Sequence, residues 1–156
     1  MSEPLDVPID GRQSEAALVI CRGVRRLLRA HGFATVTELP LTSGRRADVV
    51  GVNGDGALVI VEIKSSVADF RADRKWRDYF AHCDRLYFAV DAGMPIDIIP
   101  EEAGLIVADS FGGEILREPA PHTIAPAARR AALLRFAVAA ADRLHRLADP
   151  GAAPEI

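Results

Sequence analysis

Acidic and basic side chains end an otherwise apolar segment, residues 58–64, whose last three residues are Glu62, Ile63 and Lys64. Residues two apart in a strand point to the same side, so the Glu62 carboxylate and the Lys64 ammonium would share a face. Charges at the end of a buried strand are costly unless they are paired or bind something. Asp48, with thirteen residues between it and Glu62, is the second carboxylate that could lie beside them.

Two neighbouring carboxylates can bind a hard divalent cation through oxygen, and such a cation keeps several of its waters. A cation held in this way lowers the pKa of its bound water and polarises a phosphoryl oxygen. A lysine beside it can orient that water and stabilise the charge that develops on the phosphate. We therefore predict a metal-dependent site for phosphodiester hydrolysis, with Asp48, Glu62 and Lys64 as catalytic residues and the two carboxylates as metal ligands.

Local patterns predict the elements that must position these residues. Apolar residues at helical spacing predict a helix over about residues 12–30, after a capping box at 10–13. Alternation and β-branched residues predict three strands, over residues 35–41, 46–52 and 58–64. Between the last two, the sequence Asn-Gly-Asp-Gly at 53–56 favours a hairpin, so these strands should be antiparallel neighbours.

The hairpin register decides whether Asp48 and Glu62 can meet. They face each other if paired residue numbers sum to 110, which joins Val52 to Leu58 across a five-residue loop. A sum of 108, with a three-residue loop, leaves them diagonal on one face, whereas a loop of two or four residues puts them on opposite faces. The proposed site therefore predicts a bulge or an odd-numbered loop.

The remaining elements complete an α/β domain with a mixed (α+β) sheet. They are a helix over 67–83, a strand over 84–91, one helical turn over 100–103, a strand over 104–110, a short edge strand over 115–118 and a helix over 126–148. The last helix should pack through an apolar side made of Leu133, Leu134, Ala137, Ala141 and Leu144. We expect a loose arm over 1–11, a single domain over 12–148 and a disordered tail over 149–156.

Composition limits the classes of function. The 156 residues are enough for one domain with a real core, and no apolar run is long enough to span a membrane. No secretion signal begins the chain, and two cysteines without metal-site spacing favour a cytoplasmic protein with free thiols. Because the net charge is −3, DNA binding must rest on local basic clusters. Three such clusters occur, although each one alone fits a solvated helix face better. They are Arg22, Arg25, Arg26 and Arg29, then Arg45 and Arg46 beside Asp48, and then Arg71, Arg74, Lys75 and Arg77.

At these residues the sequence resembles the PD-(D/E)xK nuclease superfamily and, within it, the MmcB-like DNA-repair proteins. The resemblance rests on residues 47–50 (Ala-Asp-Val-Val), 59–64 (Val-Ile-Val-Glu-Ile-Lys) and 69–79, and it extends through 84–90 and 104–109. It covers about residues 12–118. It implies a restriction-endonuclease-like core with the order helix–strand–strand–strand–helix–strand, to which this chain adds strands and a C-terminal helix.

The resemblance also implies a site, a cofactor and a substrate. Asp48, Glu62 and the backbone carbonyl of Ile63 would bind Mg²⁺ or Mn²⁺, and Glu15 would be a further ligand from the first helix. DNA would be the substrate, with Arg45, Arg46, Lys75 and Tyr79 as substrate-binding residues. Some members carry Gln-x-x-x-Tyr where this chain has Lys75 and Tyr79, and lysine cannot replace the glutamine carbonyl. Ala47 replaces the proline of the motif, which contributes no ligand.

Other interpretations of the same residues stay open. Asp48 could pair with Arg45 or Arg46 on a surface strand, and Glu62 and Lys64 could be an exposed edge pair. Glu15 could be an ordinary first-turn acid, which we favour. Trp76 and Tyr79 fit a core better than a platform for bases.

Three functions compete at this stage. The first is a DNA-repair nuclease, and the second is a DNA-structure-binding repair accessory with little or no activity. A small-molecule enzyme on another α/β fold is weaker, because the chain has no Gly-rich phosphate loop and no nucleophile elbow. By analogy with nucleases that cut both strands, a homodimer through the C-terminal helix is a further expectation.

Overall fold

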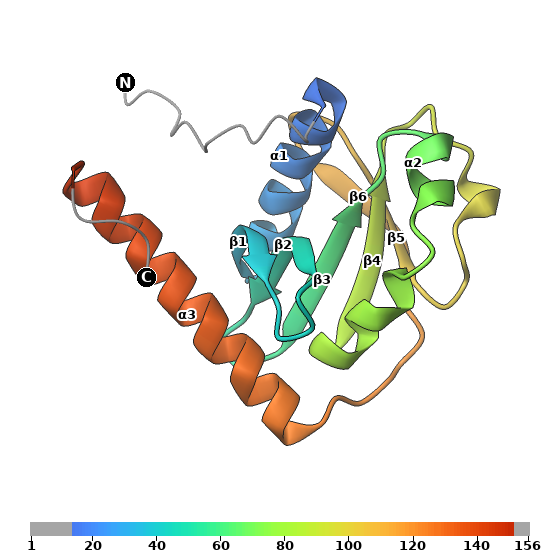
Figure 1. Ribbon diagram of the computed structural model, residues 1–156. Coiled ribbons are helices and arrows are strands. Elements are labelled where there is room, and N and C mark those ends of the chain that lie inside the picture. The colour runs from blue at the N-terminus through green and yellow to red at the C-terminus, as the bar shows by residue number, and fades with distance from the viewer. Residues whose placement is uncertain (1–13, 152–156) are drawn as a thin grey trace.

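One mixed sheet of six strands, in the order β1-β2-β3-β4-β5-β6, organises the computed structural model, which describes residues 14–151 (Figure 1). The strands are β1 (Ala34–Pro40), β2 (Arg46–Val52), β3 (Leu58–Ile63), β4 (Arg85–Val90), β5 (Gly104–Ala108) and β6 (Gly113–Arg117). The α-helices are α1 (Glu15–Ala30), α2 (Val67–Ala72) and α3 (Pro126–Ala148), and the 3₁₀ helices are η1 (Trp76–His82) and η2 (Ile96–Ile98).

The neighbouring pairs β3–β4 and β4–β5 are parallel, and the other neighbours are antiparallel. The sheet is therefore mixed, and the chain follows the order helix–strand–strand–strand–helix–strand predicted for a restriction-endonuclease-like core. The additional strands β5 and β6 and the C-terminal helix α3 are also present, so the predicted fold class is confirmed.

Helix α1 covers one face of the sheet (Figure 1). The Ser14 side chain caps it by accepting a hydrogen bond from the Ala17 amide at 3.1 Å, so the helix begins at Glu15 and not near residue 12. Its buried side is apolar and packs on strand residues of the same face, among them Val61, Tyr87 and Ile106. The predicted capping box at 10–13 and the arm at 1–11 lie outside the described residues.

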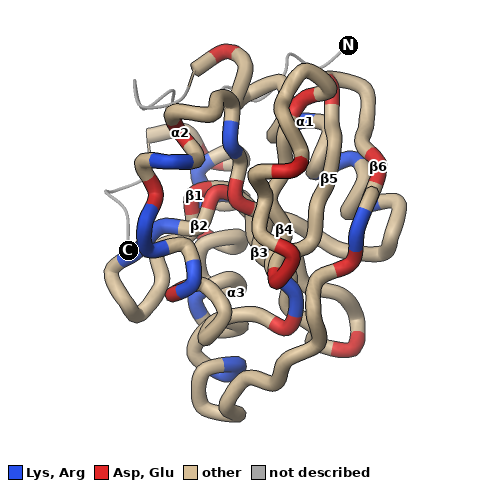
Figure 2. Tube along the Cα trace, turned by 90° about the vertical axis from the view of Figure 1, so that its right-hand side faces the viewer, with Lys and Arg blue, Asp and Glu red and all other residues tan. Residues whose placement is uncertain are grey.

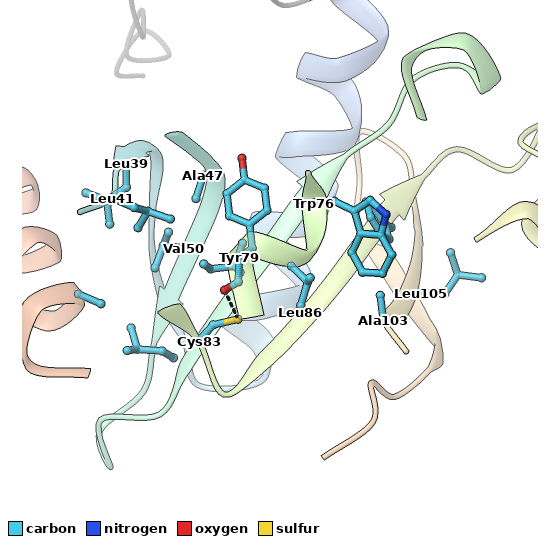
Figure 3. Close-up of a cluster of buried hydrophobic side chains, with 14 of the residues drawn as sticks. Leu39, Leu41, Ala47, Val50, Trp76, Tyr79, Cys83, Leu86, Ala103 and Leu105 are labelled. Atoms are coloured by element: carbon cyan, nitrogen blue, oxygen red, sulfur yellow. Dashed lines mark hydrogen bonds between the residues drawn. The ribbon is translucent and has the colours of Figure 1, made fainter. Parts of the chain in front are cut away.

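The opposite face is covered by α2, η1 and α3. Trp76 and Tyr79 from η1 are buried there against strand residues such as Val50 and Leu86 (Figure 3). Trp76 also meets the Phe88 ring edge to face, with centroids 5.2 Å apart. Both aromatic residues therefore belong to the core, as favoured from the sequence.

The hairpin has the register on which the predicted site depends. Val52 pairs with Leu58 and Val49 with Val61, so paired residue numbers sum to 110 and the loop holds the five residues 53–57. The Asn53 side chain accepts hydrogen bonds from the amides of Asp55 and Ala57, both at 3.0 Å, and Gly56 has a φ of +79°. The odd-numbered loop is confirmed, and the turn chemistry of Asn53 and Gly56 explains it.

The single helix predicted over 67–83 is wrong. The structure instead has α2, then a break at residues 73–75, then the 3₁₀ helix η1. Asp73 ends α2 with extended backbone (φ −87°, ψ 99°), and its carboxylate bonds outside the helix, as described below. The hydrogen bonds of the Asp73 side chain therefore interrupt the helix, although the apolar residues on both sides have helical spacing.

Smaller differences follow along the chain. Residues 100–103 form a turn, closed by the amide of Ala103 on the carbonyl of Pro100, and the short helix lies earlier, at η2. Strand β6 is the predicted edge strand, and it begins at Gly113. Residues 149–151 follow α3 as a turn, whereas 152–156 lie outside the described residues. Across residues 14–151, the structure contains no helix with both the length and the apolarity needed to span a membrane.

Helix α3 has the predicted bounds but a different buried side. Of the predicted apolar side, Leu133 packs on the core, together with Ala132 and Phe136, whereas Leu134 and Leu144 are 53% and 66% exposed. Three arginines anchor this orientation: Arg129 bonds Asp84, and Arg135 and Arg143 donate to backbone carbonyls of β1. Because apolar residues occur on several sides of this helix, these polar anchors decide which side packs.

Candidate active site

Asp48 and Glu62 meet where the pairing of β2 with β3 ends. The backbone N–H of Asp48 donates to Glu62 Oε1 at 3.0 Å, and the backbone N–H of Ile63 donates to Asp48 Oδ2 at 2.8 Å. The last regular pair before them is Val49 with Val61. Carboxylate oxygens thus take the place of backbone carbonyls as acceptors, and two acidic side chains lie together between the two strands.

Both carboxyl groups are shielded from water, which changes their acidity. The pKa of Asp48 is raised to about 6, mainly by burial and also by the charge of Glu38, although the hydrogen bond from the Ile63 N–H acts in the opposite direction. Burial also raises the pKa of Glu62, which is only 4% exposed, well above its usual value, and the charge of Asp48 adds to this. Two carboxylates that resist ionising side by side would be stabilised by a cation between them.

Lys64 follows β3 and is buried, with 6% of its surface exposed. Its Nζ pairs with Asp73 Oδ2 at 3.0 Å. Strand β3 is an interior strand of the sheet, flanked by β2 and β4. The interpretation of Glu62 and Lys64 as an exposed edge pair is therefore wrong.

Asp73 is the residue of this cluster that the sequence analysis missed. Besides Lys64, its carboxylate accepts from the Lys75 amide at 3.1 Å and from Arg45 Nη2 at 3.4 Å. Burial alone would raise the pKa of Asp73, but the hydrogen bond and charge of Lys64 outweigh it, so the pKa is lowered. Its sequence context, Arg-Ala-Asp-Arg-Lys, is that of a solvated helix face, and only the break in the helix reveals its role.

The two arginines before Asp48 have acidic partners of their own. The guanidinium of Arg45 lies over the Tyr79 ring, 4.8 Å from its centroid, and also lies 3.9 Å from Asp78. Arg46 pairs with Glu38 at 2.6 Å. The alternative in which Asp48 pairs with either arginine is therefore wrong.

Tyr79, predicted to bind substrate, is buried in the core (Figure 3). Its hydroxyl donates to the backbone carbonyl of Arg46 at 3.1 Å, which ties η1 to the start of β2. The structure therefore places Tyr79 beneath Arg45, where it supports the guanidinium.

Lys75 is exposed at the start of η1, in a basic stretch with Arg71 and Arg74, which are also exposed. Within residues 14–151, the side chains of these three residues have no acidic partner. Figure 2 shows Lys and Arg gathered on the side of the molecule that carries α2, β1 and β2. We call Arg71, Arg74 and Lys75 the basic segment.

Glu15 is the first residue of α1 and is exposed. Among residues 14–151, no three His, Cys, Asp or Glu side chains form a group that could hold a metal ion. The structure thus does not bring Glu15 to Asp48 and Glu62, and its role as a ligand stays a prediction. The donors that the structure brings together are two carboxylates, and such hard oxygen donors suit Mg²⁺ that keeps most of its waters.

Comparisons with known structures and protein families show what this chain is similar to. It is similar to a solved structure from Silicibacter pomeroyi, SPO1766 protein of unknown function, with 42% identity and a TM-score of 0.86 over 91% of this chain and 97% of that one. A repair endonuclease from Pyrococcus abyssi gives 21% identity and a TM-score of 0.37 over 54% of this chain and 40% of that one, too little to support an argument.

No curated protein gives a significant match. The family described as DNA repair protein MmcB-like matches residues 5–151, nearly the whole chain. This chain therefore belongs to the MmcB-like family of DNA repair proteins, which supports a role in DNA repair.

Proposed function

We propose that this protein is a Mg²⁺- or Mn²⁺-dependent nuclease that hydrolyses DNA phosphodiester bonds during repair. The observation that carries the proposal is the meeting of Asp48 and Glu62 where the pairing of β2 with β3 ends, with both pKa values raised. Neighbouring carboxylates whose pKa values are raised mainly by burial destabilise the fold when they ionise and are useful for binding a cation. Family membership supports DNA as the substrate.

Asp48, Glu62 and the Ile63 carbonyl would hold the metal ion. When bound, the ion would supply a water of lowered pKa and a Lewis acid for the phosphoryl oxygen. The ammonium of Lys64 has three N–H donors, and Asp73 takes one of them. The remaining two can donate to a phosphate oxygen on which negative charge develops.

DNA binding is proposed along the basic segment. Its three exposed cations lie directly beside Asp73, in α2 and on the connection between α2 and η1. Phosphates of a DNA strand would contact them while the bond to be cleaved lies at Asp48 and Glu62. Arg45 and Arg46 would contact the same strand from the start of β2. Acting on DNA, the protein would work in the cytoplasm.

The second candidate is a DNA-structure-binding repair accessory with little or no activity. It is favoured by the small number of acidic ligands, since in the described residues no third acidic side chain joins Asp48 and Glu62 in a metal group. In addition, one oxygen of each carboxylate already accepts a backbone N–H. Such a site could keep its residues for DNA binding while holding metal weakly.

A nuclease assay separates the two candidates. Branched, single-stranded and duplex DNA are incubated with purified protein and Mn²⁺, beside the Glu62→Ala variant prepared in the same way. The nuclease proposal expects cleavage by the wild type and loss of cleavage in the variant. Equal loss of DNA in both samples would identify a contaminant and favour the accessory. The homodimer expected from the sequence stays a prediction, which light scattering of the purified protein tests.

A further inference from the structure

Asp73 joins two cations on the face of the sheet that carries Asp48 and Glu62. Its Oδ2 lies 3.0 Å from Lys64 Nζ, and its Oδ1 lies 3.4 Å from Arg45 Nη2. The backbone N–H of Lys75 donates to the same Oδ1 at 3.1 Å, which fixes the orientation of the carboxylate. The backbone next to Asp73 thus fixes its carboxylate, and the carboxylate in turn fixes the side chains of Lys64 and Arg45.

The position of Asp73 depends on the break between α2 and η1. Its amide donates to the Phe70 carbonyl at 3.3 Å, and the backbone then becomes extended. A helix continued through this point would carry the side chain around the helix axis, away from Lys64. The break is therefore what brings a third carboxylate to the buried end of β3.

Lys64 has two sets of acidic neighbours. Its charge lowers the pKa of both Asp48 and Glu62, whereas the charge of Asp73 raises the pKa of Glu62. The ion pair of Lys64, however, is with Asp73. A buried ammonium needs an anionic partner, so without Asp73 the nearest remaining carboxylates are those of the proposed metal site.

We propose that Asp73 is a positioning residue that holds Lys64 beside the Asp48–Glu62 pair and prevents its ammonium from neutralising that pair in place of a metal ion. This inference rests on the proposed function, because it assigns Asp73 a role toward the same site. Asp73 acts through Lys64 and Arg45 and does not itself bind the ion. Removing its charge should let Lys64 pair with Glu62 or Asp48, and the ammonium would then compete with the cation.

The test is a set of four proteins: wild type, Asp73→Asn, Lys64→Met, and the double variant Asp73→Asn/Lys64→Met. Mn²⁺ binding to each is measured by isothermal titration calorimetry, so that no readout depends on activity. Asp73→Asn should lower the affinity for Mn²⁺ by about tenfold or more, the usual effect of removing a partner that orients a metal site. The double variant should regain the wild-type affinity, because its lysine can no longer compete.

The restoration in the double variant is the result that a merely structural role of Asp73 would not give. Equal affinity in wild type and Asp73→Asn overturns the inference, and so does equally weak binding in Asp73→Asn and the double variant. If the wild type binds no Mn²⁺, the proposed function fails and this inference fails with it. If the wild type binds Mn²⁺ but the affinities of the variants differ from those expected, this inference fails and the proposed function does not.

A measurement on the unmodified protein covers the case in which Asp73→Asn does not fold. The chain has only two lysines, Lys64 and Lys75, so labelling lysine with ¹⁵N gives two ammonium signals in NMR spectra. With Mg²⁺ bound, the Lys64 signal should correlate through its hydrogen bond with the Asp73 carboxylate carbon. A correlation with the Glu62 or Asp48 carboxylate instead overturns the inference.

Discussion

Asp48 and Glu62 are joined across the end of the β2–β3 pair, where the backbone N–H of Asp48 donates to Glu62 Oε1 at 3.0 Å. Each carboxylate lies beside the backbone of the other strand, since Asp48 Oδ2 accepts from the Ile63 N–H. The pair is therefore part of the sheet and is placed as firmly as the strands themselves. Its position depends on the five-residue hairpin loop, whose length sets the register.

This pair makes the stability of the metal-free protein depend on pH. The folded-state pKa of Asp48, about 6, and that of Glu62 lie above the values of the unfolded chain. The folded state thus holds these protons more tightly, and the stability that they contribute is full below about pH 4 and is lost as pH rises through the folded-state pKa values. From Asp48 alone we expect the wild type to lose about 1 kcal/mol between pH 5 and pH 7.5, and Glu62 should add to this loss.

The Asp48→Asn/Glu62→Gln variant isolates this contribution, because both amides can still accept the backbone hydrogen bonds. Urea unfolding of both proteins at pH 5 and pH 7.5, with chelator present, should show the variant gaining stability relative to the wild type as pH rises. Parallel changes in the two proteins would mean that the pair does not titrate as described.

Mn²⁺ should stabilise the wild type. An ion that binds only the folded state at about one hundred times its Kd adds about 2.7 kcal/mol, which for a domain of this size raises the Tm by about 5–10 °C. Asp48→Asn should abolish the shift, measured by differential scanning calorimetry at pH 7.5. Asp55→Asn is the matched control, because it removes an exposed carboxylate from the hairpin loop and should keep the full shift. A shift that survives in Asp48→Asn would place the ion elsewhere.

DNA should bind along the basic segment. Replacing Arg71, Arg74 and Lys75 by alanine should weaken DNA binding and reduce the slope of log K against log salt by up to about 3, because each cation that neutralises a phosphate adds roughly one to that slope. Fluorescence anisotropy at several salt concentrations measures both the DNA affinity and its dependence on salt. A control variant replaces three exposed cations of α1 and α3, namely Arg22, Arg29 and Arg130. Similar losses in the two variants would contradict a defined DNA surface.

Tyr79 should contribute to the stability of the fold and not to DNA affinity. Tyr79→Phe removes the hydroxyl that donates to the Arg46 carbonyl and keeps the buried ring, so we expect a loss of about 1 kcal/mol in the free energy of unfolding. DNA affinity should stay within about twofold of the wild type, because the ring is buried in the core. A much larger loss of DNA affinity with unchanged stability would restore the substrate-binding role predicted from the sequence.

The hairpin could be predicted because local turn chemistry determines it. Asn53 and Gly56 favour a tight turn between the two strands, and in the structure the side-chain hydrogen bonds of Asn53 and the positive φ of Gly56 form the five-residue loop. The odd-numbered loop, by contrast, was predicted from the proposed site, because only such a loop puts Asp48 and Glu62 on one face. Local signals of the same kind predicted the bounds of α3.

Asp73 and the buried side of α3 could not be predicted because distant contacts decide them. Helical spacing continues through Asp73, and its partners Lys64 and Arg45 lie nine and 28 residues away in the chain. Likewise, α3 is apolar on more than one side, and Arg129 and Arg143 orient it through partners 45 and 106 residues away. In both cases a polar contact between elements overrides a periodic pattern within one.

The central claim is that Asp48 and Glu62 share one divalent cation, and crystals soaked with Mn²⁺ test it most directly through anomalous scattering. The account predicts one anomalous peak within about 2.0–2.6 Å of an oxygen of each carboxylate, the range of hard-cation ligands. The absence of that peak at saturating Mn²⁺ would contradict the claim. Electron density that places Lys64 Nζ between the two carboxylates would contradict it as well.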